Sequence, residues 1–203
     1  MKQGWEKKRL GEVCSMIARG IAPKYTESEG IQVINQKCIR DHYINMSLAR
    51  THNVDLKPVN SNKLIQVGDV LVNSTGVGTL GRVAQVRHIV DKDITVDTHV
   101  TIVRPTADIF FLDFFGYLLI KIEDEIEKSG EGASGQIELP RKKLENNFVV
   151  NYPNSFQEQK RIVAKLDKCF EATKKARVNV KKTLLNLDEL DNSILQKAFN
   201  GEL

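Results

Sequence analysis

Short apolar or alternating segments, separated by turns, fill the chain up to about residue 153. Such segments occupy residues 31–39, 63–75, 81–86 and 99–105. Residues 31–39 alternate between apolar and polar side chains, which is typical of a half-buried strand. Gly68 and Asp69 separate two apolar runs, so we expect a hairpin or tight turn there. Residues 110–127 predict an apolar core helix that becomes amphipathic toward its charged end.

The pattern changes after Pro153. Residues 155–200 contain neither proline nor glycine, and Gly201 follows at the position expected for a C-cap. Steps of four and three residues from Leu166 trace a seam in which seven of ten positions are apolar. This is the 3.5-residue period of a coiled coil. We expect a dimer interface at the apolar seam positions Leu166, Phe170, Val180, Leu184, Leu187 and Ile194.

The alternative is an amphipathic helix that lies along its own domain. About 45 residues at ~1.5 Å each extend about 65 Å, which exceeds the width of a domain of about 150 residues. We therefore expect the helix to pack on a partner. Arg177 and Asp191 weaken the seam, and such polar residues can also fix its register. The fold class expected is α+β: a mixed α/β domain over residues 1–152, then a long helical region over residues 153–203.

Composition and charge narrow the function classes. The 203 residues are 41% hydrophobic and 28% charged, as in a soluble globular protein. The net charge of +4 divides into +1 for residues 1–153 and +3 for the rest. A nucleic-acid partner is therefore permitted, and it would have to be bound by local patches rather than by an overall basic domain.

Neither a metal site nor a membrane segment is expected. The histidines show no ligand spacing such as H-E-x-x-H. The three cysteines form no C-x-x-C pair, which favours reduced thiols in a cytoplasmic protein. The amino terminus is too polar for a signal peptide, and the longest apolar run, residues 109–120, is too short to span a bilayer.

Residues 76–81, Gly-Val-Gly-Thr-Leu-Gly, match the G-x-G-x-x-G pattern of dinucleotide-binding turns. That fingerprint requires a helix to open at its third glycine. Here the third glycine is followed by RVAQVRHIV, a β-branched, alternating stretch typical of a strand. We therefore expect these glycines to form a hairpin turn through positive φ or a bulge, and not to bind a nucleotide.

Four motifs in order carry a resemblance to a known family. They are the GD-V-L strand leading to the spaced glycines (residues 65–86), DTHVTIVRP (97–105), the P…EQ…IV…L entry to a long helix (138–167) and the closing SIL…AF-GEL (190–203). The opening W…L-GEV…ARG-IAP (5–23) also fits. In these motifs, over almost its whole length, the chain resembles the specificity subunit of type I restriction–modification systems.

The resemblance implies a non-catalytic, DNA-reading protein. The family's subunit has two target-recognition domains, each followed by a long helix, and the two helices pack antiparallel. It docks modification subunits that bind S-adenosylmethionine and methylate adenine, and these recruit a restriction subunit. This chain has one domain and one helix, so we expect half of a bipartite target to be read by each copy of a homodimer. A natural half-subunit and a fragment both remain open.

Candidate DNA contacts lie in loops rich in polar residues and glycine, where side chains can reach base edges and phosphates. No catalytic residue, metal ligand or cofactor is expected in this chain. The candidates are Arg19, Lys24, Tyr25, Asn35, Lys37, Arg40, Ser74, Thr75, Thr79, Arg82 and Gln136. The alternative function is a coiled-coil scaffold or adaptor whose globular head binds protein rather than DNA.

Overall fold

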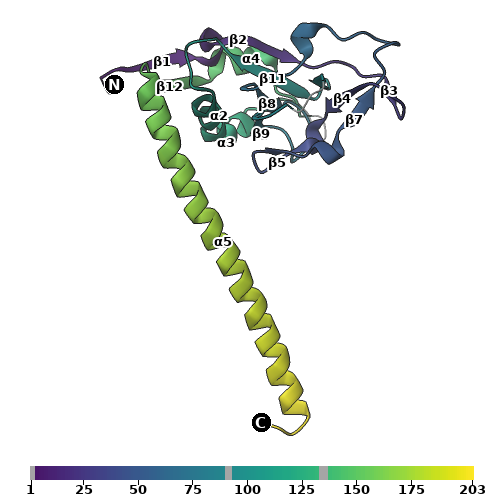
Figure 1. Ribbon diagram of the computed structural model, residues 1–203, viewed down its shortest axis with the longest axis vertical. Coiled ribbons are helices and arrows are strands. Elements are labelled where there is room, and N and C mark those ends of the chain that lie inside the picture. The colour runs from purple at the N-terminus through teal and green to yellow at the C-terminus, as the bar shows by residue number, and fades with distance from the viewer. Residues whose placement is uncertain (1–2, 90–92, 133–136) are drawn as a thin grey trace. The chain divides into compact units, whose positions relative to one another are not determined.

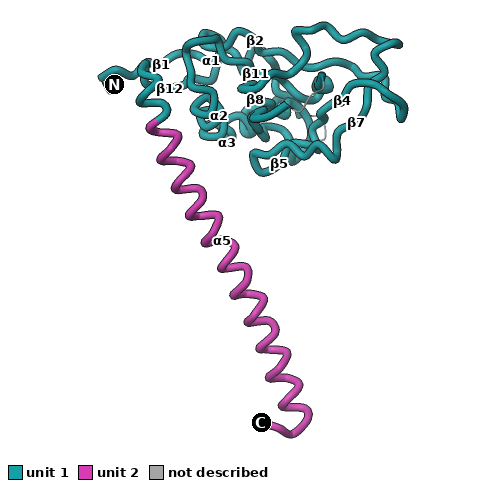
Figure 2. The backbone as a smooth tube through the Cα atoms, in the orientation of Figure 1, with its two compact units in different colours: residues 1–160 teal, residues 161–203 magenta. Residues whose placement is uncertain are grey.

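The computed structural model describes residues 3–89, 93–132 and 137–203. It divides into two compact units, residues 1–160 (the head) and residues 161–203 (Figure 2). The strands are β1 Trp5–Arg9, β2 Cys14–Arg19, β3 Tyr25–Thr26, β4 Ile31–Ile34, β5 Ile39–Arg40, β6 Tyr43–Ile44, β7 Arg50–His52, β8 Val70–Asn73, β9 Val83–Gln85, β10 Ile94–Val96, β11 Val100–Pro105 and β12 Val149–Pro153. The helices are α1 Leu10–Val13, α2 Leu112–Lys121, α3 Glu123–Lys128, α4 Arg141–Asn147 and α5 Phe156–Phe199.

The centre of the head is an antiparallel sheet in the order β2-β11-β8-β9 (Figure 1). All residues of β8 and β9 are buried, which explains their apolar, β-branched composition. Helix α2 packs beside β9 and buries Phe115 and Leu119. The predicted strands at residues 81–86 and 99–105 are thereby confirmed, as is the helical, buried character of the first part of the predicted core helix.

A second sheet, in the order β10-β4-β7-β3, shares the core of the first. Ile34 and Val96 from this sheet join Leu71 and Ile102 from the central one in a single buried cluster. The two sheets are connected through the short turn between β10 and β11. Both ends of that turn, Val96 and Val100, lie in the buried cluster, so the core holds the turn in position.

Two predicted elements differ from those observed. The strand expected over residues 31–39 ends at Ile34, because the Asn35 side chain accepts a hydrogen bond from the Lys37 N–H and starts a 3-10 helix over Gln36–Cys38. The helix expected over residues 110–127 is divided at Ile122 into α2 and α3. The first difference comes from side-chain capping and the second from the non-helical backbone of Ile122 (φ −100°, ψ 7°), neither of which the apolar pattern encodes.

The turn at Gly68 and Asp69 is present and is fixed by a buried ion pair. Gly68 has φ +97°, and the Asp69 carboxylate accepts hydrogen bonds from the Gln66 N–H at 2.8 Å and from Nε and Nη2 of Arg104 at 2.7 Å each. Arg104 lies on β11, so the pair ties this turn to the central sheet.

Helix α5 has 44 residues and ends at the expected glycine. Gly201 has φ +74°; its N–H donates to the Ala198 carbonyl and the Glu202 N–H to the Lys197 carbonyl, the two bonds of a Schellman cap. The boundary expected at residue 152 precedes the helix, whereas the compact units divide at residue 160, because the first turn of α5 packs in the head. Antiparallel pairing of two such helices stays a prediction. None of the helices in the described part of the chain has the length and apolar character of a membrane span.

Candidate nucleic-acid interface

The glycine turn, residues Gly76–Gly81, joins β8 to β9. Its three glycines, at positions 76, 78 and 81, have φ of +99°, +70° and +88°. The N–H groups of Thr79 and Leu80 both donate to the Gly76 carbonyl, which closes the turn. The prediction of a hairpin with positive-φ glycines is confirmed, and no helix opens at Gly81 as a dinucleotide site requires.

Segments distant in sequence meet at this turn. The Gln36 side-chain oxygen accepts a hydrogen bond from the Thr79 hydroxyl at 3.3 Å, and the Thr75 hydroxyl is bonded to Nδ1 of His99 at 2.7 Å. The segment after residue 136 also joins, because the Gly76 N–H donates to the Ile137 carbonyl. These contacts gather a set that we call the polar surface, consisting of Gln36, Thr75, Thr79, Arg82 and His99.

His99 is positioned by the turn between β10 and β11. Its backbone N–H donates to Oδ1 of Asp97 at 2.9 Å, so the Asp97 side chain closes an Asx-turn. Burial raises the pKa of the Asp97 carboxyl. The backbone hydrogen bonds from His99 and Val100 and the charge of His99 lower it in part. His99 is exposed, so its imidazole can contact a ligand.

Two arginines near the turn, Arg82 and Arg19, use some of their N–H donors in hydrogen bonds to backbone carbonyls. Nη2 of Arg82 donates to the Gly78 carbonyl at 2.6 Å. Nη2 of Arg19 donates to the Leu139 carbonyl at 3.2 Å and forms an ion pair with Glu138 at 2.7 Å. A guanidinium has five N–H donors, so each arginine keeps donors beyond these contacts.

Some predicted DNA contacts lie on or beside the polar surface. Thr75, Thr79 and Arg82 belong to it, and the exposed Lys37 follows Gln36 directly. Asn35 is close by, but its side chain is used within the protein, since Nδ2 donates to the Leu48 carbonyl and Oδ1 accepts from Lys37. We therefore assign Asn35 a structural role.

Ser74 is corrected. Its side chain is fully buried, and its hydroxyl is bonded to that of Thr101 at 2.5 Å, across the β8–β11 pair. A hydroxyl in this position holds the sheet together and does not reach a base. Ser74 directly follows the fully buried strand β8, so its side chain is enclosed in the sheet as those of β8 are.

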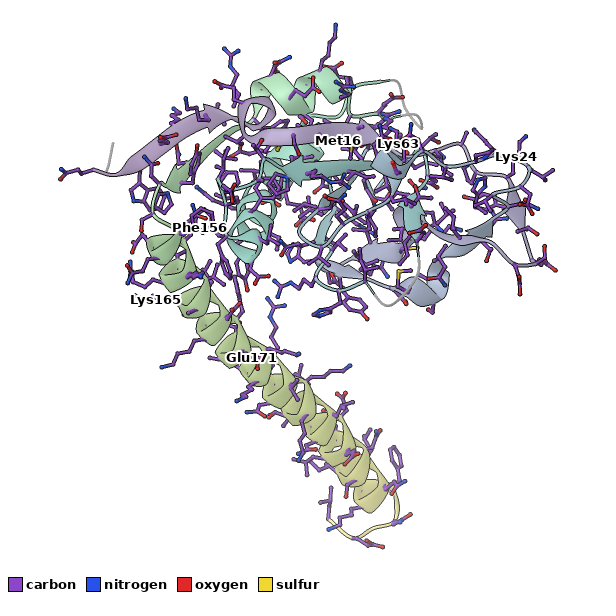
Figure 3. The ribbon with its side chains drawn as sticks, turned by 45° about the horizontal axis from the view of Figure 1, so that its top comes forward. Met16, Lys24, Lys63, Phe156, Lys165 and Glu171 are labelled. Carbon is purple, nitrogen blue, oxygen red and sulfur yellow. The ribbon has the colours of Figure 1, made fainter. Side chains whose placement is uncertain are left out.

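Three other predicted contacts form no hydrogen bond with the glycine turn in the described part of the chain. Lys24 directly precedes β3, which carries Tyr25, and it lies at the end of the head opposite Phe156 (Figure 3). The guanidinium of Arg50 stacks on the Tyr25 ring at 3.4 Å from its centroid, and burial raises the pKa of the Tyr25 hydroxyl. Arg40 is exposed on the β5–β6 hairpin. Gln136 lies outside the described residues.

Residues that the sequence analysis missed are His99, with Asp97 behind it, and Glu138. An Asp two residues before His99, between two predicted strands, was a readable Asx-turn signal. Glu138 carried no such signal, because its pairing with Arg19 joins segments 119 residues apart. Among the described residues, no group of three or more His, Cys, Asp or Glu side chains is arranged to hold a metal ion.

The predicted dimer-interface residues lie on α5. Leu166 is half-buried, and the others are exposed, with Val180, Leu184 and Leu187 between 52% and 59% and Ile194 at 45%. Phe170 is likewise 50% exposed. An apolar row of this extent on one helix is typical of a surface covered by another chain.

Known proteins match both the sequence and the fold. The type I restriction modification DNA specificity domain matches residues 2–182. Over 178 residues the chain is 28% identical to the specificity subunit of the Escherichia coli type I restriction enzyme EcoBI, covering 86% of this chain and 36% of that protein.

Solved structures show the same fold. The HsdS subunit from Thermoanaerobacter tengcongensis superposes with a TM-score of 0.69 at 24% identity, over 100% of this chain and 46% of that one. A chain from a structure of type I R-M system assembly gives 0.75 at 23% identity, over 100% and 47%. The chain thus spans less than half the length of these relatives. By its sequence match over residues 2–182, the protein belongs to the family of type I restriction modification DNA specificity domains.

Proposed function

We propose that this chain reads one half of a bipartite DNA target for a type I restriction–modification complex. The observation that carries the proposal is the polar surface, where side chains from three separate loops meet at the glycine turn. Gln36 is bonded to Thr79, Thr75 to His99, and Arg82 to the Gly78 carbonyl. Their donors and acceptors are of the kinds that read base edges and phosphates. Family membership supports DNA as the ligand.

Catalysis belongs to other subunits in this proposal. The chain docks modification subunits, which bind S-adenosylmethionine and methylate adenine, and through them the restriction subunit. The head supplies sequence specificity, and the helix supplies distance and docking surface. The length of α5, about 66 Å for 44 residues, supports a spacer role.

Two copies of the chain assemble through α5 in the proposed complex. The exposed apolar row that includes Val180, Leu184 and Leu187 supports this pairing. In an antiparallel pair, the two heads are related by a two-fold axis. Each head then reads the same half-site in the opposite orientation.

Selection from random DNA tests the proposal. We expect the chain together with its modification subunit to enrich one motif from a library of random duplexes at low salt. A head that binds protein instead would enrich no motif. His99→Ala should weaken binding to the selected motif severalfold, because one hydrogen-bonding side chain contributes about 1 kcal/mol.

His88→Ala is the matched control. His88 is also exposed and follows β9 at the end of the hairpin opposite the glycine turn. This variant should bind the motif like the wild type. If both substitutions weakened DNA binding equally, the polar surface would not be the site that reads DNA.

A further inference from the structure

The glycine turn contains two backbone N–H groups for which the described residues provide no acceptor. The other four N–H groups of the turn, and that of Arg82 directly after it, donate to backbone carbonyls. These four are the N–H groups of Gly76, Thr79, Leu80 and Gly81. The N–H groups of Val77 and Gly78 donate to no acceptor in the described part of the chain. The Val77 side chain is 66% exposed, and a Cβ built on Gly78 would meet no atom within 4 Å. This part of the turn therefore faces open space.

The backbone that carries these two N–H groups is held firmly. The Thr79 hydroxyl lies 3.2 Å from the Thr75 carbonyl and shares its single proton between this oxygen and that of Gln36. The Gly81 N–H donates to the Asn73 carbonyl at 2.9 Å. A Cβ on Gly81 would lie 2.6 Å from Cα of Glu127, so the base of the turn is packed against α3. A ligand here would meet donors whose positions are already fixed, which lowers the entropy cost of binding.

A positive charge lies at the same place. Arg82 reaches back to the Gly78 carbonyl at 2.6 Å, and the guanidinium retains further N–H donors. Consecutive free N–H groups in a turn form an anion-binding concavity. An adjacent guanidinium strengthens binding of a phosphate through charge-assisted hydrogen bonds.

We propose that the Val77 N–H, the Gly78 N–H and the Arg82 guanidinium bind one phosphate of the DNA backbone. The glycine turn then fixes the register of the head on the duplex, and neighbouring side chains such as His99 read bases. This inference rests on the proposed function. A free phosphate shares the chemistry of a backbone phosphate, so the tests separate the two sources.

A matched pair of substitutions at Gly78 gives the first test. Asn and Asp both tolerate positive φ, they are nearly equal in size, and the site around the Cβ is empty. Gly78→Asn should bind DNA nearly as the wild type does. Gly78→Asp places a carboxylate beside the phosphate, and its affinity should fall about tenfold or more, for target and non-target DNA alike.

Gln66→Glu controls for the added charge, because it introduces the same charge at the opposite end of the hairpin, where Gln66 is exposed. Its affinity should change less than that of Gly78→Asp. Equal DNA affinities for Gly78→Asn and Gly78→Asp, with both variants folded by circular dichroism, would overturn the inference.

Salt dependence gives the second test. Arg82→Gln should reduce the slope of log K against log salt by about 0.9, the value for one lost phosphate contact. Arg87→Gln, at the other end of the same hairpin, should leave the slope unchanged. A single methylphosphonate in the duplex should weaken the wild type and not Gly78→Asp. An unchanged slope for Arg82→Gln would contradict the inference.

Amide NMR of the full chain separates this inference from the proposed function. Inorganic phosphate, titrated at constant ionic strength against chloride, should shift the Val77 and Gly78 amide signals saturably if the turn takes free phosphate. Shifts with DNA alone assign the site to the backbone phosphate. If the wild type binds no DNA with its modification subunit, the proposed function fails. In that case the phosphate titration decides separately whether the turn binds anions: if the Val77 and Gly78 amide signals also do not shift with phosphate, the anion site is refuted.

Discussion

Single residues determine how the loops of the head are held, and the Asp69–Arg104 pair is the clearest case. The Asp69 side chain is 1% exposed and that of Arg104 is 16% exposed, so both charges are largely removed from water. Each depends on its partner, because an unpaired buried charge is strongly unfavourable. The sequence predicted the turn at Gly68 and Asp69 but not the arginine, since the pairing depends on the register of β8 and β11.

Removal of one partner of this pair should destabilise the head. We expect Asp69→Ala to lower the free energy of unfolding by about 3–5 kcal/mol, measured by urea denaturation. Arg141→Ala is the control, because Arg141 is 61% exposed and paired with Glu145 one helical turn away. It should cost about 0.5 kcal/mol or less. Similar losses for the two variants would show that Arg104 finds other compensation.

Tyr152 should make stability depend on alkaline pH. Burial, followed by its hydrogen bond to Glu6 at 2.9 Å, raises the pKa of Tyr152 to about 12, from an ordinary value of 10.0. The folded protein thus keeps a proton that the unfolded chain releases, and this stabilisation is complete below pH 10 and lost between pH 10 and 12. The free energy of unfolding should fall more steeply there for the wild type than for Tyr152→Phe.

The control for this measurement is Tyr43→Phe, since Tyr43 is 69% exposed. It should retain the steep wild-type decline. If Tyr152→Phe declines as steeply as the wild type, another group is responsible for the alkaline loss.

Loop residues show how far side-chain roles could be read from the sequence. Thr75, Thr79 and Arg82 were predicted because glycine-rich polar turns commonly bind ligands, and they do lie together. Ser74 looked equivalent to Thr75, but Ser74 directly follows the fully buried strand β8 and its hydroxyl is bonded to Thr101, whereas Thr75 is only half-buried. His99 joins the polar surface only through the register of β11 on β8, which no local pattern specifies.

Among the elements, those with strong periodicity were predictable. The hairpin β8–β9, the strand β11 and the helix α5 each follow from apolar patterns within one segment. Of the second sheet, only β4 was predicted, as the first part of the alternating stretch 31–39. The strands β3 and β7 were not predictable, because they have only two and three residues and acquire their order from pairing with β4 and with each other. Their stability comes from the shared core rather than from local propensity.

The start of α5 is fixed by Gln159, whose side chain is fully buried. Its Oε1 accepts from the Phe111 N–H at 2.7 Å, and its Nε2 donates to the carbonyls of Ile109 and Pro153. Gln159→Leu would leave three backbone groups without partners, so we expect a loss of about 3 kcal/mol or more in unfolding free energy. Gln157→Leu, on the exposed side of the same turn, should change it by about 0.5 kcal/mol or less.

At the scale of the whole molecule, pairing through α5 is the expectation with the largest consequence. We expect the purified chain to sediment as a dimer at tens of micromolar. Leu184→Asp combined with Leu187→Asp would bury unpaired charges in the seam and should give monomers. Val178→Asp combined with Leu185→Asp adds the same charges off the seam and should leave the dimer intact. A monomeric wild type would refute the pairing.

The division into a head and a long helix was readable because the composition changes sharply after Pro153. The assembly that two such chains form could not be predicted from the sequence, because an apolar seam does not specify which surface packs against it. The proposed answer is geometric. Two heads on an antiparallel helix pair approach one duplex as a two-fold dimer, with half-site centres about one helical turn, ~10 base pairs, apart.

Mapping of methylated adenines tests this account most directly. The measurement uses cells in which this chain is the only specificity subunit, supplied with its modification subunit. We predict an interrupted palindrome, with two inverted copies of one half-site around unread bases, and a spacer that changes when a whole helical turn is added between Lys174 and Asn186. A recurring asymmetric motif, or methylation without any sequence preference, would contradict it.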